Sequence, residues 1–177
     1  MKAVIVGGGI GGLATAIALR LRGWDVEVLE QAPELSEAGA GLQISPNGWR
    51  VLDALGVTPQ LQATLFEPEA SEMRLGRSGC SVFRLPMKGY AQQRWGAPYV
   101  HIHRADLADA LAMRLRALAP GAVSTGQTVT GYVQDDDQAG VVLQSARTVQ
   151  ADIVIGADGL HSVVRRQMLG PGAPRYT

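Results

Sequence analysis

The residues best suited to chemistry in this sequence are glycines near the N-terminus. Gly7, Gly9 and Gly12 fit the pattern G-x-G-x-x-G between an apolar run and an amphipathic segment. In this pattern the first glycine permits a tight turn, the second lets a pyrophosphate approach the backbone, and the third allows helix and strand to pack closely. The N–H groups that open the following helix face the phosphates. The spacing therefore predicts a dinucleotide site, to which Ile10 and Gly11 also belong.

An acidic residue supports this prediction. Glu30 ends the next apolar run, eighteen residues after Gly12. A carboxylate near this offset accepts hydrogen bonds from an adenosine ribose, and it would repel a ribose 2′-phosphate. The alternative is an ordinary exposed acid at the end of a strand. Together with the upstream glycines, Glu30 favours FAD or NAD over NADP as the ligand.

The elements expected around these residues are a strand, a helix and a second strand. Residues 3–6 form an apolar run, residues 10–22 carry apolar side chains at helical spacing, and residues 24–29 alternate as a strand does. Gly23 is expected to end the helix. This order is typical of a right-handed crossover between parallel strands. The sequence thus predicts an α/β fold with a Rossmann-like domain and a parallel sheet.

Later segments predict further elements of the same fold and a small β-meander. Residues 135–137 are three consecutive aspartates, which we interpret as a solvated hairpin tip, because adjacent strand-end residues do not converge on one ion. The other expected elements are a tight loop at 39–41, a helix from 46 to 55, short strands and loops over 72–99, a helix at 106–118, strands at 123–133, 140–143 and 151–155, and a helix at 162–168.

Composition excludes several classes of protein. Sixteen basic and sixteen acidic residues give zero net charge, and no basic stripe with interleaved aromatic residues is present, so no nucleic-acid partner is expected. The single cysteine, Cys80, excludes an internal disulfide and suits the cytoplasm. Glycines interrupt the N-terminal apolar run, and Arg20 and Arg22 follow it, so neither a signal peptide nor a membrane span is expected. His101 and His103 lack a third ligand, so no metal site is predicted.

Three further segments follow the glycine fingerprint in order. They read GAGLQISPN at residues 39–47, HRADL at 103–107 and ADGLHSVVR at 157–165. Together the four segments resemble the FAD-dependent aromatic hydroxylases, the single-component flavoprotein monooxygenases that include salicylate and hydroxybenzoate hydroxylases. The resemblance spans nearly the whole chain. It implies FAD as cofactor, NADH or NADPH as electron donor, and molecular oxygen and a small phenolic or benzoate-like aromatic as substrates.

The resemblance also implies roles for individual residues. Arg104 matches an arginine near the ribityl and pyrophosphate groups of the flavin, and a planar guanidinium suits phosphate oxygens. Val129 matches a strand residue that meets the adenine through its backbone, and Asp158 and Gly159 match an Asp-Gly motif on the pyrophosphate side. Gly41 belongs to the matching glycine loop. The ordinary alternatives are a surface arginine, a core valine and a turn between a strand and a helix.

The chain also departs from the family pattern. A Gly-Asp motif that the family carries beyond its substrate sheet is not found, so the chain looks like an N-terminal portion. We expect residues 1–71 and 101–177 to form the FAD-binding domain and residues 72–100 to begin the substrate sheet. Rival classes are another flavoprotein oxidoreductase and a non-catalytic dinucleotide-binding module, although the lack of a Cys-x-x-Cys pair counts against a disulfide reductase.

Several properties stay open at this point. His161 and Arg165 lie where relatives meet NAD(P)H, and they are equally well explained as capping or surface residues. No catalytic base is assigned. The aromatic substrate, the choice of nicotinamide and the oligomeric state, a homodimer included, do not follow from the sequence.

Overall fold

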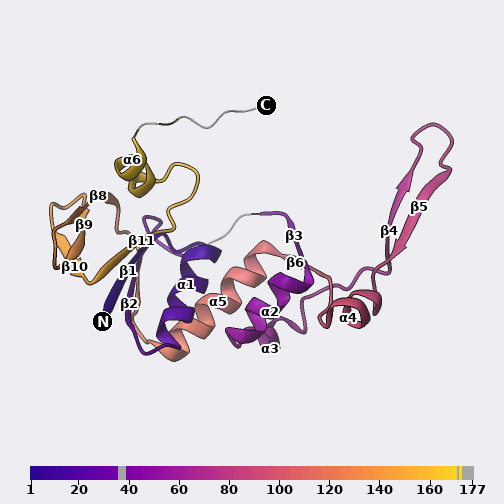
Figure 1. The fold of residues 1–177 in the computed structure, drawn as a ribbon, viewed down its shortest axis with the longest axis horizontal. Coiled ribbons are helices and arrows are strands. Elements are labelled where there is room, and N and C mark those ends of the chain that lie inside the picture. Colours follow the sequence, from indigo (N-terminus) through magenta and orange to yellow (C-terminus); the bar gives the residue numbers. More distant parts are fainter. Residues whose placement is uncertain (36–38, 171, 173–177) are drawn as a thin grey trace. The chain divides into compact units, whose positions relative to one another are not determined.

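The structure is a computed structural model that describes residues 1–35, 39–170 and 172. The chain folds into two compact units (Figure 1). The first unit contains the described residues of 1–37 and 108–177, and the second unit contains the described residues of 38–107. Within the described residues, none of the helices is both long and apolar enough to span a membrane.

A parallel sheet forms the centre of the first unit. Its order is β11-β1-β2-β7, and each neighbouring pair runs parallel. Ala3, Val4 and Ile5 of the central strand are completely buried. Strands covered on both faces read as continuous apolar runs, which explains the N-terminal pattern. The strands are β1 (Lys2–Val6), β2 (Asp25–Leu29), β7 (Val123–Ser124) and β11 (Ile153–Gly156).

Helix α1 (Ile10–Arg20) connects β1 to β2. It buries Leu13, Ala16 and Ile17, which lie on one face because they are three or four residues apart. The helix ends slightly earlier than expected, and Gly23 follows it with a φ of +83°. The predicted strand, helix and strand are confirmed.

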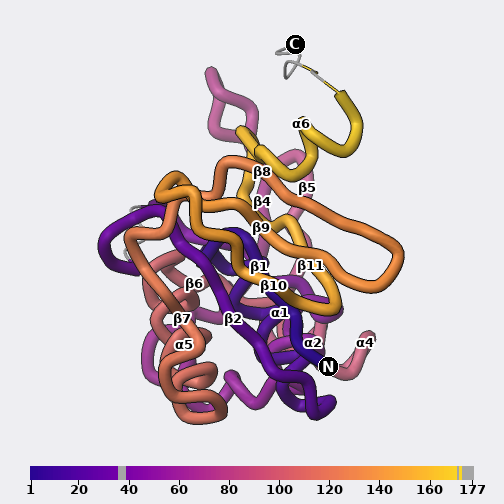
Figure 2. The backbone as a smooth tube through the Cα atoms, turned by 90° about the vertical axis from the view of Figure 1, so that its left-hand side faces the viewer, coloured from indigo at the N-terminus to yellow at the C-terminus, as the bar shows by residue number. Residues whose placement is uncertain are grey.

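A three-stranded antiparallel meander packs beside the parallel sheet, as the tube in Figure 2 shows. The tip between its first two strands is the acidic turn, where Asp135 accepts hydrogen bonds from the N–H groups of Asp137 and Gln138. These two bonds lower the pKa of the Asp135 carboxyl. The predicted hairpin tip is confirmed. The elements here are β8 (Val129–Gln134), β9 (Ala139–Leu143), β10 (Thr148–Ala151) and helix α6 (Val163–Leu169).

Two segments were each predicted to form a single strand, and both predictions are wrong, because each segment is divided between two strands. The strand predicted at 123–133 is split into β7 and β8, which belong to different sheets. Between them Gly126 has a φ of +66°, and Gly126 and Gln127 donate backbone hydrogen bonds to the carbonyls of Ala32 and Glu30. The strand predicted at 151–155 is split at Asp152, whose N–H and carboxylate both bind the backbone of Lys2. In both cases the apolar sequence pattern continues across a point where the chain leaves one sheet and enters another.

The second unit contains helices around a short antiparallel pair. Gly41 is the first residue of β3 rather than part of a loop, and Arg104 begins the helix that was expected from residue 106. Helix α4 was not predicted, because residues 72–99 carry frequent glycines and prolines. The elements of this unit are β3 (Gly41–Ile44), β6 (Val100–His103), α2 (Pro46–Ala54), α3 (Thr58–Leu61) and α4 (Tyr90–Trp95). Helix α5 (Arg104–Leu118) begins in this unit, and its residues from Ala108 onward belong to the first unit.

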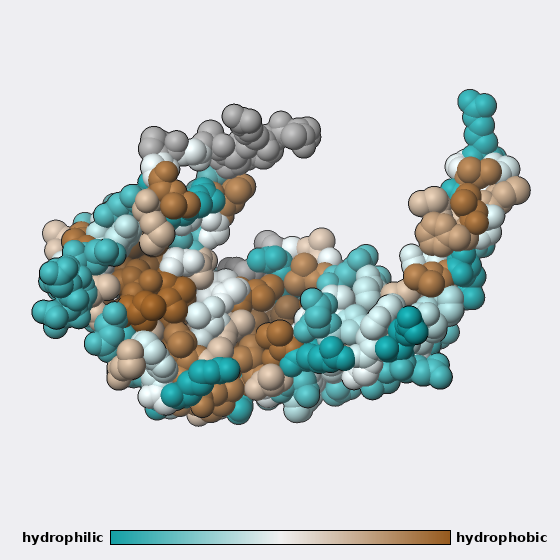
Figure 3. Space-filling model, viewed as in Figure 1, coloured by the Kyte–Doolittle hydropathy of each residue, from teal (hydrophilic) through white to brown (hydrophobic). Residues whose placement is uncertain are grey.

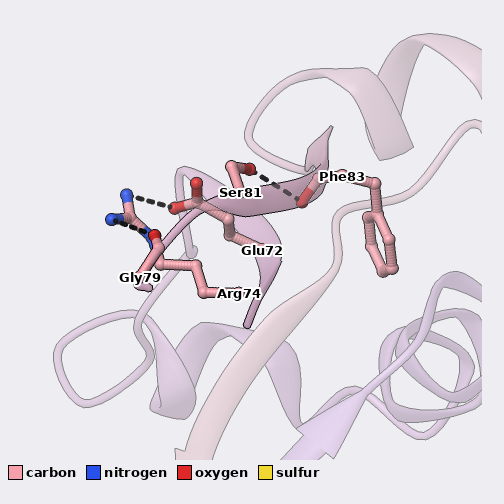
Figure 4. Close-up of polar contacts among 5 residues, drawn as sticks. All are labelled: Glu72, Arg74, Gly79, Ser81 and Phe83. Carbon is pink, nitrogen blue, oxygen red and sulfur yellow. Dashed lines mark hydrogen bonds and ion pairs between the residues drawn. The ribbon is translucent and has the colours of Figure 1, made fainter. Parts of the chain in front are cut away.

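The second unit also carries a hairpin of β4 (Ala70–Arg74) and β5 (Ser81–Pro86). Its apolar side chains Met73 and Phe83 pair across the strands yet remain about half exposed. Figure 3 shows hydrophobic surface, in brown, on the hairpin. The polar side of the hairpin is tied together by Arg74, which contacts the carboxylate of Glu72 and the carbonyl of Gly79 (Figure 4). The hairpin is therefore amphipathic.

Candidate dinucleotide-binding site

The candidate site lies where β1, β2 and β11 end, because the carboxyl ends of parallel strands meet at one edge of a sheet. Gly7 makes the first turn with a φ of +105°, and its N–H donates to the carbonyl of Leu29 at 2.8 Å. A Cβ atom at Gly7 would collide with the carbonyl of Ala157. A Cβ atom at Gly12 would collide with the carbonyl of Gly7. The turn and the helix packing behind it therefore require glycine at both positions.

Helix α1 begins without a side-chain cap. Gly9 is the N-cap residue, with φ −72° and ψ −178°, and it has no side chain that could bind the first turn. The first turn contains no acidic residue. The N–H groups at this end therefore carry the positive end of the helix dipole toward a ligand. Gly11 differs from its neighbours because a Cβ atom there would meet nothing within 4 Å.

Two backbone N–H groups hold the carboxylate of Glu30. Oε2 accepts from the N–H of Gly8 at 2.6 Å, and Oε1 accepts from the N–H of Ala32 at 2.8 Å. The side chain is half-buried at the end of β2. An ionised carboxylate offers about four lone-pair directions, so both oxygens can still accept from a ligand hydroxyl. The structure thus fixes the position of Glu30 without using all of its acceptors.

The turn after β11 has a different construction. Asp158 accepts hydrogen bonds from the hydroxyl of Ser162 at 2.6 Å and from the N–H groups of Val163 at 2.7 Å and Val164 at 3.2 Å. The Ser162 hydroxyl in turn accepts from the N–H of Arg165 at 2.9 Å. Asp158 and Ser162 therefore cap helix α6 together. The carboxylate of Asp158 thus orders the backbone at the start of α6.

A cavity of about 250 Å³ joins these parts. Its volume is slightly below the range of about 300–1,000 Å³ that is usual for small-molecule sites. The cavity brings together six of the residues predicted from the sequence, namely Gly7, Gly9, Glu30, Val129, Asp158 and Gly159. His161, which the sequence left open, also lines it.

Sequence reasoning missed two polar residues of this cavity. Gln31 directly follows Glu30, and Gln127 comes two positions before Val129. The N–H of Gln127 donates to the carbonyl of Glu30 at 2.8 Å, and its side-chain amide donates to the carbonyl of Thr125 at 3.3 Å. Only their adjacency to predicted site residues could have indicated them.

The remaining predicted site residues lie elsewhere. Ile10, Gly11 and Gly12 form the first turn of α1 and are not among the residues that line the cavity. Gly41 and Arg104 belong to the second unit. There the N–H of Arg104 donates to the carbonyl of Ala40 at 3.3 Å, and a Cβ atom at Gly39 would come within 2.8 Å of the Arg104 side chain. The two motifs at 39–47 and 103–107 thus meet, while the roles of Gly41 and Arg104 toward a cofactor stay predictions.

The chain matches a known protein family. The model of the FAD-binding domain family matches residues 1–171. A 3-amino-4-hydroxybenzoate 2-monooxygenase of Streptomyces cremeus is 42% identical over 99% of this chain and 44% of its own length. The chain spans less than half the length of this relative.

Solved structures agree with the sequence comparison. The tetrameric form of 2-methyl-3-hydroxypyridine-5-carboxylic acid oxygenase superposes with a TM-score of 0.82 at 33% identity, over 95% of this chain and 42% of that one. A variant of Klebsiella pneumoniae HpxO complexed with FAD gives a TM-score of 0.83 at 28% identity, over 97% and 43%. The chain therefore belongs to the FAD-binding domain family, as a relative of the FAD-dependent aromatic hydroxylases that its motifs resemble.

Proposed function

We propose that the cavity at the ends of β1, β2 and β11 binds the adenosine and pyrophosphate groups of FAD. The residues fit this ligand on three counts. The uncapped start of α1 offers N–H groups to phosphate oxygens, the turn at Gly7 leaves backbone at the surface, and the carboxylate of Glu30 keeps acceptors for ribose hydroxyls. The observation that carries the proposal is the meeting of Gly9, Glu30 and Asp158 in one cavity.

The protein's own residues divide the work of holding the cofactor. Gly9 opens the helix toward the pyrophosphate, and Glu30 orients the ribose. The backbone of Val129, which lines the cavity, would contact the adenine, and Asp158 holds Gly159 in place by capping α6. Arg104 and Gly41 belong to the second unit, and their roles toward the ribityl and pyrophosphate groups rest on the resemblance of their motifs.

The same proposal extends to the reaction of the complete protein. Bound FAD supplies oxidation and reduction chemistry with NADH or NADPH and molecular oxygen. The substrate that we propose is a small hydroxylated aromatic carboxylic acid, since 3-amino-4-hydroxybenzoate and 2-methyl-3-hydroxypyridine-5-carboxylic acid in the names of the relatives share this chemistry. Residues 72–100 then begin the substrate sheet, and residues 1–71 and 101–177 form the FAD-binding domain. A cytoplasmic enzyme fits the single exposed cysteine.

Cofactor identification tests the proposal most directly. The complete protein encoded by the reading frame is purified, the bound cofactor is released and identified, and oxidation of NADH and NADPH is followed with a panel of phenolic, benzoic and hydroxypyridine acids. We expect released FAD and a substrate-dependent increase in nicotinamide oxidation. Bound NAD without flavin would reject the FAD site, whereas bound FAD without any stimulated oxidation would leave only a dinucleotide-binding module.

A further inference from the structure

Helix α6 is held by few contacts, although its first residues help to form the cavity. It is seven residues long, and Val164 is its one buried side chain among the described residues. Val163 lines the cavity at the N-terminal end of the helix. The caps from Asp158 and Ser162 fix that end only. The direction of the helix axis therefore needs a second point of attachment.

Gln167 provides that attachment. Its Oε1 accepts from the N–H of Tyr132 at 2.8 Å, and its Nε2 donates to the carbonyl of Tyr132 at 2.7 Å. A side-chain amide that binds both groups of one residue imitates a neighbouring β-strand. In this way α6 is joined to β8, the strand that begins with the cavity residue Val129.

The neighbouring residue Gly131 makes the approach possible. A Cβ atom at Gly131 would lie 2.9 Å from Oε1 of Gln167, which is too close for a real contact. The register of β8 against β9 also shifts between Val129 and Gly131, which marks a β-bulge. Bulges redirect side chains and strand edges, and this one lies directly before Tyr132, the residue that Gln167 binds.

The spacing connects this attachment with the cavity. Gln167 and Val163 are four residues apart and lie on one face of α6, while Tyr132 is three residues beyond Val129 in β8. We infer that Gln167 is a positioning residue of the proposed FAD site, which holds α6 against β8 and thereby sets the separation of Val163 and Val129 across the cavity. This inference rests on the proposed function, because it names FAD as the ligand.

The experiment compares FAD affinity and thermal stability in variants of the complete protein. Gln167→Ala removes both hydrogen bonds, and Gln167→Glu keeps the size but loses the donor to the Tyr132 carbonyl. We expect each variant to bind FAD about three- to tenfold more weakly at a temperature well below its midpoint of unfolding. Met168→Ala is the matched control on the same helix, because Met168 is 62% exposed, and it should bind FAD as the wild type does.

A double-mutant cycle separates positioning from a general loss of stability. Gly131→Ala alone should weaken FAD binding because its methyl group displaces Gln167, whereas in the Gln167→Ala background it should change the affinity by less than about twofold. Variants with a lower melting temperature and unchanged FAD affinity would overturn the inference, as would fully additive effects of the two substitutions. A wild-type protein that binds no FAD would reject the proposed function itself, and the inference with it.

Discussion

Two turns at the same edge of the parallel sheet have opposite constructions. The turn after β1 leads into α1, whose N-cap is Gly9 and whose first turn has no side-chain cap. The turn after β11 leads into α6, whose first turn is capped by Asp158 and Ser162. One helix therefore leaves its N–H groups for a ligand, and the other satisfies them internally. Only the first turn therefore leaves N–H groups that can bind an anion, while the hydrogen bonds of the second turn fix its shape.

The two turns also support each other. The N–H of Ala157 donates to the carbonyl of Val6 at 2.8 Å, and the carbonyl of Ala157 occupies the space that a Cβ atom at Gly7 would need. The rigid turn after β11 therefore restricts which residue can stand at Gly7, in the turn after β1. Substitutions in either turn can separate the binding role from the supporting role.

The largest effect is expected for Gly7→Ala. The added methyl group would collide with backbone and would force a non-glycine residue to a φ of +105°. We expect a loss of about 3–5 kcal/mol in the free energy of unfolding and FAD binding weakened more than about 100-fold. Urea unfolding and flavin titration measure both quantities. Gly11→Ala is the matched control, since the space around Gly11 is open, and equal damage from both variants would refute the steric explanation.

Asp158→Ala should have the second-largest effect on stability. It removes the acceptor for the Ser162 hydroxyl and for two N–H groups of α6, so we expect a loss of about 2–3 kcal/mol in stability. FAD affinity should fall less than in Gly7→Ala, because the carboxylate acts through the helix. Thermal unfolding and flavin titration test this order. Asp136→Ala removes an exposed aspartate at the hairpin tip and should change neither quantity.

Glu30→Gln tests the proposed binding role of the turn after β1, which the Glu30 carboxylate contacts through Gly8. The amide keeps one acceptor oxygen but places an NH₂ group against the N–H of Gly8 or of Ala32. We expect about tenfold weaker FAD binding and a stability loss of about 1–2 kcal/mol. Flavin titration gives the first value and urea unfolding the second. Unchanged FAD retention would show that Glu30 only orders the loop.

The smallest effect belongs to Ser162→Ala. It removes the acceptor for the Arg165 N–H, and the loss of an N-cap typically costs about 1 kcal/mol. Ser45→Ala is a close control, because Ser45 is the N-cap residue of α2 but makes no cap hydrogen bond there. A difference in melting temperature between the two variants confirms the cap, and equal melting temperatures would contradict it.

The turn after β1 could be predicted from the sequence because the residues that form it lie close together along the chain. The run before Gly7, the spacing of Gly7, Gly9 and Gly12, and the position of Glu30 all follow from one strand-helix-strand unit. The break between β7 and β8 was not predictable in this way. It depends on hydrogen bonds that Gly126 and Gln127 make to residues nearly a hundred positions earlier, and no local pattern records such partners.

The second turn was predicted in position but not in detail. Asp158 and Gly159 were placed at the site, and both line the cavity. The pairing of the Asp158 carboxylate with α6 depends on how closely the turn folds back, which residue types alone do not determine. Gln167 was missed for the same reason: an exposed glutamine near a helix end has no distinctive pattern until its partner strand is known.

The position of β1 in its sheet has a consequence for synthesis of the chain. β1 is made before the other strands of its sheet, yet one of its two neighbours is β11, where Ala3 pairs with Ile153. At about 5–20 residues per second, the ribosome needs about 8–30 s to reach that neighbour. Until then one side of β1 offers unpaired backbone, a ready template for wrong pairing. Pairing with β2 protects the other side of β1 during this interval, and faster translation of residues 38–152 should shorten the exposure of the unpaired side.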